Sequence, residues 1–150
     1  MDAKIIESLG MIGATAAISL SAIGSALGTG VAGMAAIGAW KKCYAQGKAA
    51  TFLLLAFVGA PLSQTIYGMI LMFVMKTSVE NGAPFPPLLG AGIFGGLAIG
   101  ISAWFQGKAG AAGAHALAET EQGFTNYLAV LGVVETVAIF VMVFLLLIIQ

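Results

Sequence analysis

Charge is scarce in this sequence. Charged residues make up 8% of the 150 residues, and the six basic residues, all lysines, balance six acidic residues to a net charge of zero. A nucleic-acid-binding surface and a polybasic lipid-binding segment both need clustered lysine and arginine. We therefore expect no nucleic acid among the partners of this protein.

The side chains that usually carry enzyme chemistry are nearly absent as well. A single cysteine, Cys43, cannot form an internal disulfide, and the single histidine, His115, is interpreted as a surface residue near a helix end. The dipeptides Gly47-Lys48 and Gly107-Lys108 lack the rest of a phosphate-binding loop. We expect this chain not to be an enzyme by itself.

Hydrophobic residues, in contrast, are abundant. They account for 60% of the chain, and the mean hydropathy is +1.04, outside the range of water-soluble domains. A helix needs about 20 apolar residues to cross a hydrocarbon core of about 30 Å. Four stretches meet this requirement: Leu9 to Trp40, Phe52 to Met75, Leu88 to Ala118, and Phe124 to Ile149. The sequence therefore predicts an all-α membrane protein, with four transmembrane helices in a single membrane domain spanning residues 1–150.

The breaks between these stretches are short and differ in charge. They run from Lys41 to Lys48, from Lys76 to Pro87 and from Glu119 to Gly123. The first contains three lysines, whereas Lys4 and Lys76, on the opposite side, are each accompanied by acidic residues. Because loops enriched in lysine stay in the cytoplasm, we expect a cell-membrane protein whose first and third turns are cytoplasmic and whose termini face outward. The first apolar run is too long for a signal peptide, so we expect it to be retained.

Glycine is distributed unevenly. Fifteen of the 21 glycines lie in the first and third predicted helices, several of them spaced by four residues, as in Gly24 and Gly28. Small residues at this spacing let helix backbones approach closely. We expect the first and third helices to form a close-packed inner layer of the kind that suits an oligomeric ring, although glycine is also common in ordinary compact membrane bundles.

The two halves of the chain look like copies of one helical hairpin. The segment Ile23-Gly24-Ser25-Ala26 resembles Ile99-Gly100-Ile101-Ser102-Ala103, and Gln64-Thr65 aligns with Glu135-Thr136. Repeated hairpins are a common membrane architecture. The sequence predicts an internal repeat of residues 9–76 and 88–149.

One acidic residue lies inside a predicted span. Glu135 is 12 residues from Gly123 and 15 from the last residue, which places it about 18 and 22 Å from the two helix ends. Gln106 lies 13 residues before Glu119, so counting back from the shared turn brings it level with Glu135. An intramembrane acid is costly unless it is paired or protonated, which makes Glu135 a functional hypothesis by default.

A polar stripe on the second predicted helix lies near the same depth. The spacing i, i+3, i+4, i+7 of one helical face is followed by Ala60, Ser63, Gln64 and Tyr67. Pro61 has no N–H, so the carbonyl of Phe57 loses its usual partner and the loosened backbone can turn a carbonyl oxygen toward a ligand. Together with Glu135 and Gln106, the stripe offers hard oxygen donors that suit a small hard cation. Each amide or hydroxyl taken singly could instead join helices by hydrogen bonds, and a lone Glu could remain protonated and structural.

Four stretches carry a resemblance to a known family. They are Ile23-Gly24-Ser25-Ala26-Leu27-Gly28-Thr29-Gly30, Pro61-Leu62-Ser63-Gln64-Thr65-Ile66-Tyr67-Gly68, Gln106-Gly107-Lys108 followed by Ala111-Ala112-Gly113, and Val134-Glu135-Thr136. They resemble the duplicated proteolipids, or K subunits, of V-type ATPase rotor rings. This resemblance implies a ring of identical four-helix subunits that carries one ion per subunit. A soluble ATPase head, joined through central-stalk subunits, would turn the ring in the lipid against a stator subunit that supplies a cationic residue.

The resemblance also implies a sodium site. The Na+ ligands carried over are Glu135, Ser63, Gln64, Gln106 and the carbonyl of Ala60, with Tyr67 holding the glutamate. Ser63 stands where the family has threonine, which keeps the hydroxyl but gives a less rigid side chain.

Three alternatives remain beside a sodium rotor. A proton-carrying rotor needs only a Glu135 that takes up a proton, and it leaves Ser63, Gln64 and Gln106 without a role. A small four-helix exporter of organic cations also uses one membrane glutamate, but its site should be lined with aromatic side chains. The third is a passive pore or a purely structural ring.

Overall fold

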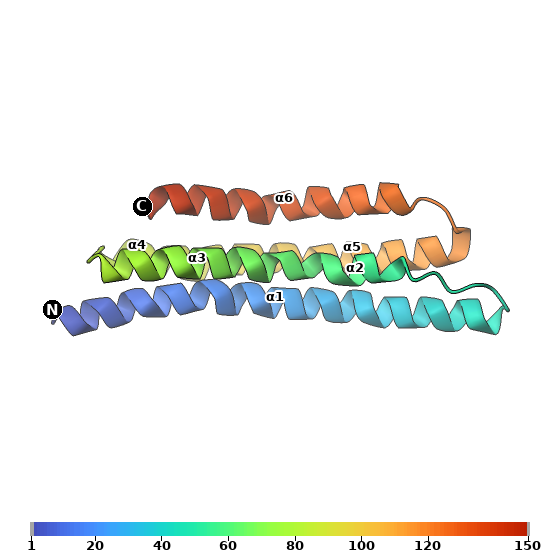
Figure 1. Cartoon of the computed structure of the whole chain (residues 1–150), viewed down its shortest axis with the longest axis horizontal. Helices are drawn as coiled ribbons and strands as arrows, with labels where there is room; N and C mark the ends of the chain where they lie inside the picture. Colours follow the sequence, from blue (N-terminus) through green and yellow to red (C-terminus); the bar gives the residue numbers. More distant parts are fainter. Residues whose placement is uncertain (1, 150) are drawn as a thin grey trace.

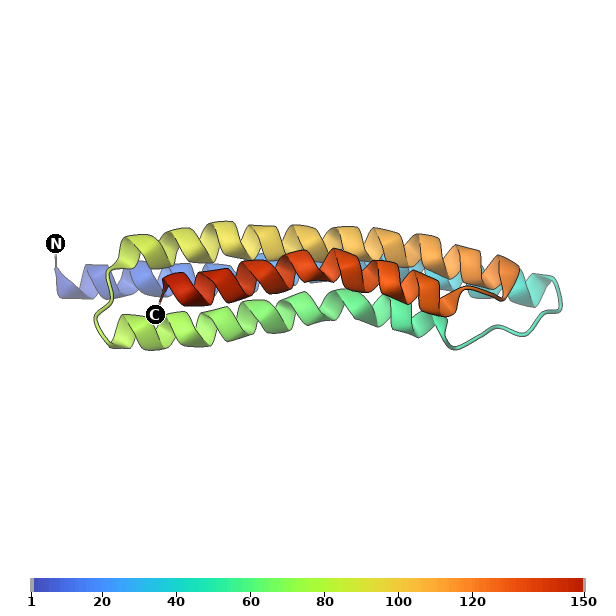
Figure 2. The same cartoon turned by 90° about the horizontal axis from the view of Figure 1, so that it is seen from above.

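The computed structural model describes residues 2–149, and every regular element in that range is helical. Four helices run side by side as an elongated bundle (Figures 1 and 2). The first is α1 (Ala3–Ala45), and the second joins α2 (Leu54–Gly59), the 3-10 turn η1 (Ala60–Leu62) and α3 (Ser63–Glu80). The third joins α4 (Phe85–Gly90), the π-helical η2 (Ala91–Gly95) and α5 (Gly96–Thr120), and the last is α6 (Phe124–Ile148).

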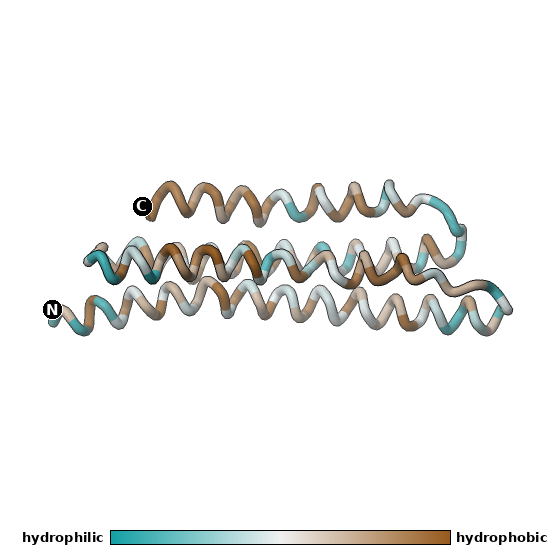
Figure 3. Tube along the Cα trace, viewed as in Figure 1, coloured by the Kyte–Doolittle hydropathy of each residue, from teal (hydrophilic) through white to brown (hydrophobic). Residues whose placement is uncertain are grey.

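The described residues contain four helices that are long and apolar enough to cross a membrane: Ala3–Ala45, Leu54–Glu80, Phe85–Thr120 and Phe124–Ile148. The predicted class, an all-α protein with four membrane helices, is confirmed, and the chain is a multi-pass membrane protein by this criterion. Figure 3 shows polar residues gathered at the turns and at the beginning of α1.

Several predicted helix boundaries were wrong. The first helix begins at Ala3 and ends at Ala45 rather than running from Leu9 to Trp40, and the second continues to Glu80 rather than Met75. The segment from Lys76 to Glu80 is therefore helical and not part of the turn. Charged residues end the apolar run at the membrane surface, but a helix keeps its backbone hydrogen bonds in water, so its hydropathy does not mark its end.

Both described ends of the chain lie at one end of the bundle, together with the turn between α3 and α4 (Figure 1). The turns between α1 and α2 and between α5 and α6 lie at the opposite end. An exposed ion pair between Lys42 and Glu119, with 2.6 Å between Nζ and Oε1, joins the two hairpins there.

Helices α1 and α5 approach so closely that their backbones touch. A methyl group added at Gly24 would overlap the backbone of Gly100, and one added at Gly107 would overlap the backbone of Gly28. These positions need glycine because no side chain fits between the two helices. The first and third helices are thus in backbone contact, as the glycine pattern indicated.

The buried hydrophobic residues form two clusters, one toward each end of the bundle. One cluster includes Leu71, Met75 and Ile99, and the other includes Phe57 and Leu117. Helix α6 contributes only two buried residues, Leu131 and Ala138, among those described, so most of its apolar surface faces outward.

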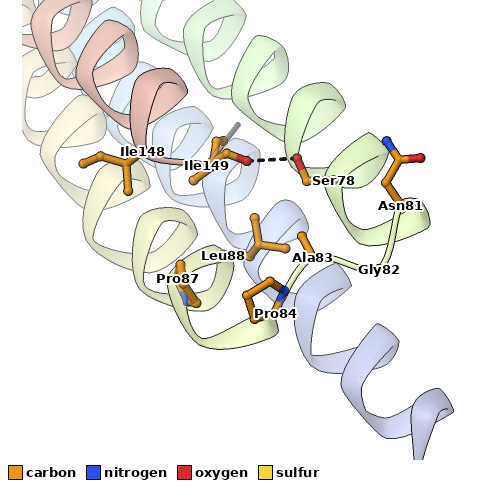
Figure 4. A pocket seen from close by; sticks show the side chains of 9 residues that line it. All are labelled: Ser78, Asn81, Gly82, Ala83, Pro84, Pro87, Leu88, Ile148 and Ile149. Carbon is orange, nitrogen blue, oxygen red and sulfur yellow. Dashed lines mark hydrogen bonds between the residues drawn. The ribbon is translucent and has the colours of Figure 1, made fainter.

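A pocket lies where the end of α6 meets the turn between α3 and α4 (Figure 4). The Ser78 hydroxyl on α3 lies 3.2 Å from the carbonyl oxygen of Ile149 and 3.1 Å from that of Val74, and either oxygen can accept its hydrogen. The contact with Ile149 links the end of the last helix to the second helix. Ile149 is 14 residues beyond Glu135, or about 21 Å along a helix. This pocket is therefore separate from the predicted ion site.

Candidate functional site

Glu135 lies near the middle of α6 and is partly exposed. Its Oε1 accepts a 2.6 Å hydrogen bond from the hydroxyl of Tyr67 on α3, and its Oε2 accepts a 3.0 Å hydrogen bond from Nε2 of Gln106 on α5. One neutral donor from each of two other helices therefore fixes the carboxylate.

Gln106 is the centre of the polar network. Its side chain is 0% exposed, its Nε2 also donates to the carbonyl of Leu131 at 3.0 Å, and its Oε1 accepts a 2.8 Å hydrogen bond from Nε2 of Gln64. The bond between Gln64 and Gln106 joins the two hairpins near the middle of the bundle. The predicted meeting of Gln106 and Glu135 at one level is present in the structure.

The second helix supplies oxygen atoms where its backbone departs from the α-helix. The Ser63 hydroxyl lies 3.0 Å from the carbonyl oxygen of Ala60 and 3.1 Å from Oε1 of Gln64, and either oxygen can accept its hydrogen. The Ala60 carbonyl also accepts the backbone N–H of Ser63, which closes the 3-10 turn η1. Three neighbouring oxygen atoms are thereby held on one side of this helix.

Pro61 explains why the backbone changes at this point. Proline cannot donate a backbone hydrogen bond, and the 3-10 turn η1 forms around it. The carbonyl of Phe57, which loses its partner, points toward α5, where a Cβ at Gly110 would lie 2.9 Å from its oxygen. Glycine at that position lets the third helix approach this carbonyl.

The structure brings all of the predicted site residues together. Hydrogen bonds connect Ala60, Ser63, Gln64, Gln106, Glu135 and Tyr67 into one network that spans the second, third and fourth helices. In residues 2–149 the two ion pairs, Lys42–Glu119 and Lys76–Glu80, are both at helix ends. The charge of Glu135 therefore has neutral dipoles around it, and a proton or a small cation is the natural neutralising group.

Two backbone contacts at the site could not be foreseen from residue types. Gln106 binds the carbonyl of Leu131, and the hydroxyl of Ser102 donates to the carbonyl of Val134 at 3.0 Å. Both acceptors belong to the turn of α6 that precedes Glu135. Together they fix the rotation of α6 about its axis, and hence the direction in which the carboxylate points.

The two remaining reactive side chains lie away from this network. Cys43 is buried near the end of α1, with its sulfur 3.9 Å from the carbonyl oxygen of Ala118, and His115 is exposed. Neither contacts the residues around Glu135. His115 is a surface residue, as predicted.

Comparison with known proteins places these residues in a family context. Residues 89–148, which include Gln106 and Glu135, match the profile of a family described as the C subunits of ATP synthases. Over 136 residues the chain is 35% identical to the A-type ATP synthase subunit K of Methanocaldococcus jannaschii, and this similarity covers 88% of the chain and 57% of that relative. The chain thus spans little more than half the length of the relative. The two matches confirm the resemblance of this chain to the V-type and A-type ATPase proteolipids.

Proposed function

We propose that this chain is the non-catalytic rotor subunit of a V-type or A-type ATPase and carries one Na+ per subunit on Glu135. The observation that carries the proposal is the convergence of Tyr67 and Gln106 on the carboxylate of Glu135, with Gln64 hydrogen-bonded to Gln106 behind it. The similarity to subunit K and to the C subunits of ATP synthases supports the rotor role. ATP would be handled by a partner.

The oxygen atoms near Glu135 support sodium as the ion. Ser63, Gln64 and the carbonyl of Ala60 lie on one helix, and Gln106 faces Gln64 from another. A dehydrated Na+ prefers carboxylate, amide, hydroxyl and carbonyl oxygens. To bind Na+, these oxygen atoms must turn toward a common point. Rotation of the Ser63, Gln64 and Gln106 side chains, which now bind one another, would bring this about.

The partial exposure of Glu135 supports the carrier role. A loaded carboxylate is neutral and can face lipid, whereas an empty one is costly there. Release of the ion then needs a compensating positive charge, and this chain has no arginine. We propose that a cationic residue of a stator membrane subunit supplies it.

The remaining partners and the orientation follow from the same role. Identical subunits would complete a ring in the lipid, and central-stalk subunits of a soluble ATPase head would bind the turns on the cytoplasmic side. The lysines of the turn between α1 and α2 favour the cytoplasm for that side, with both termini outward.

The proposal is tested by labelling the purified protein with a hydrophobic carbodiimide, which reacts with protonated carboxyl groups in apolar surroundings. Labelling of Glu135 should fall as NaCl is added at constant ionic strength, with KCl as the balancing salt, because bound Na+ displaces the reactive proton. The variant Glu135→Gln should not be labelled at this position. Substitution Gln106→Ala should raise the Na+ concentration for half protection by about tenfold or more.

The alternatives give different results. A proton-carrying rotor would lose labelling as the pH rises, with no dependence on Na+. Protection of Glu135 by organic cations but not by Na+ would instead support a cation exporter. Either result would remove sodium from the proposal.

A further inference from the structure

Two hydroxyl groups inside the bundle stand out because they lack hydrogen-bond partners. Among the described residues, Oγ of Ser25 and Oγ1 of Thr29 are inaccessible to solvent and form no hydrogen bond. Serine in a helix usually donates to the carbonyl four residues earlier, as Ser21 does to Ala17 at 2.7 Å. Ser25 is 2% exposed, and a buried hydroxyl without a partner is unfavourable.

The packing of α1 on the second helix shows what Ser25 faces. Close contacts pair Gly10 with Val79, Ser21 with Gly68, and Gly28 with Pro61. The contacts advance by 11 residues and then by 7 along α1, from Gly10 to Ser21 to Gly28. Along the second helix they go back by the same numbers, from Val79 to Gly68 to Pro61. Ser25 lies four residues after Ser21, and Gln64 lies four residues before Gly68. Ser25 and Gln64 are therefore opposite each other between the two antiparallel helices.

Gln64 has one amide hydrogen that is not used in the bond to Gln106. Its side chain is 0% exposed, and its Nε2 donates one hydrogen to Gln106. A primary amide carries two N–H groups, so a second donor remains. A buried amide donor and a buried hydroxyl acceptor at the same level of two packed helices complement each other.

We propose that Ser25 is a positioning residue of the ion site, and that its hydroxyl binds the Gln64 amide directly or through one water molecule. An acceptor on α1 favours the amide orientation in which Nε2 faces α1 and Gln106, and Oε1 faces Ser63. Without it, the amide can rotate and present N–H groups where a cation needs oxygen. The first helix, which contributes no ligand, would thus determine which end of Gln64 meets the ion.

This inference rests on the proposed sodium site, and the carbodiimide assay tests the two separately. In Ser25→Ala, the Na+ concentration that half-protects Glu135 should rise about tenfold, the size usual for groups that orient metal ligands. Ser21→Ala is the matched control: it removes a buried hydroxyl on the same helix, one turn away, that is already bonded to Ala17, and protection should stay within about twofold. Ser25→Thr keeps the hydroxyl and should keep the Na+ protection of the unmodified protein.

Labelling in the absence of Na+ reports the intact fold and should be equal in all variants. If Ser25→Ala is not labelled even without Na+, the variant is misfolded and Ser25→Cys is used in its place. Cysteine has nearly the shape of serine but offers only a weak sulfur acceptor, so the Na+ concentration for half protection should rise by the same factor. Normal Na+ protection in the folded variant would overturn the role of Ser25. Absence of protection in the unmodified protein would instead overturn the sodium site.

Discussion

At the scale of single residues, the carboxylate of Glu135 is held by two uncharged donors. The phenol of Tyr67 binds one oxygen, and the amide of Gln106 binds the other. A hydrogen bond to a charged group contributes about 1.5–3 kcal/mol. Because neither donor is cationic, the carboxylate keeps its negative charge available for an ion while its rotamer stays fixed.

Substitution Tyr67→Phe should free one side of this carboxylate. The ring remains, but the 2.6 Å hydrogen bond is lost. We expect Na+ protection of Glu135 to weaken by about one order of magnitude, which corresponds to about 1.4 kcal/mol, while ring assembly is unchanged. The measurement is carbodiimide labelling against Na+ concentration. The control is Tyr44→Phe, at an exposed side chain near the end of α1, and an equal effect of both substitutions would contradict the role of Tyr67.

Much of the site could be predicted from the sequence because helix geometry is regular. Counting residues from the shared turn was enough to place Gln106 opposite Glu135, and the i, i+3, i+4, i+7 spacing was enough to align Ser63 with Tyr67. The carbonyl of Leu131 could not be found this way, since every residue has a carbonyl. Ser25 was also missed, because its position depends on how two helices pack and not on any spacing within one.

At the scale of elements, the contact between α1 and α5 depends on glycine at defined positions. Gly24 faces the backbone of Gly100, whereas Gly38, on the same helix, has no atom within 4 Å of the place where a Cβ would lie. The same substitution should therefore have opposite effects at the two positions.

Gly24→Ala should destabilise the protein by about 1–3 kcal/mol, because the added methyl group overpacks a backbone contact. Gly38→Ala should stabilise it by about 0.5–1 kcal/mol, because alanine lowers the conformational entropy of the unfolded chain and its methyl group meets no neighbour. Thermal unfolding followed by far-UV circular dichroism in detergent gives both values. Equal midpoints for the two variants would show that α1 and α5 do not touch at Gly24.

The irregular parts of the helices were predicted only where proline marks them. Pro61 indicated a disturbed backbone, and the structure has the 3-10 turn η1 there. The π-helical segment Ala91–Gly95 had no such signal, because its glycines are also compatible with an ordinary helix. The extension of the second helix through Lys76 to Glu80 was missed because helix propensity continues where hydropathy ends.

At the scale of the whole molecule, the two ends of the bundle differ in their turns. One end has the turns after α1 and α5, and the other has the termini and the turn after α3. The arrangement fixes which segments share a side of the membrane, and the lysines between α1 and α2 predict which side that is.

The orientation can be measured with single cysteines in a Cys43→Ala background. Gln46→Cys, in the turn after α1, should react with a membrane-impermeant maleimide only in inverted vesicles. Asn81→Cys, in the turn after α3, should react only in right-side-out vesicles. Both side chains are exposed, so in vesicles that hold this protein without the soluble ATPase head, access depends on the membrane alone. The reverse pattern would invert the proposed topology.

The backbone contact between α1 and α5 has a mechanical consequence. Where two helices meet through long side chains, changes of rotamer can absorb a lateral force, so the contact deforms easily. Gly24, Gly28, Gly100 and Gly107 have no side chains to rearrange, so relative sliding of α1 and α5 requires the two helices to separate. In the proposed rotor, the pair should therefore transmit torque as one rigid unit, while α6, which carries Glu135, has few buried residues and packs less tightly against the rest of the chain.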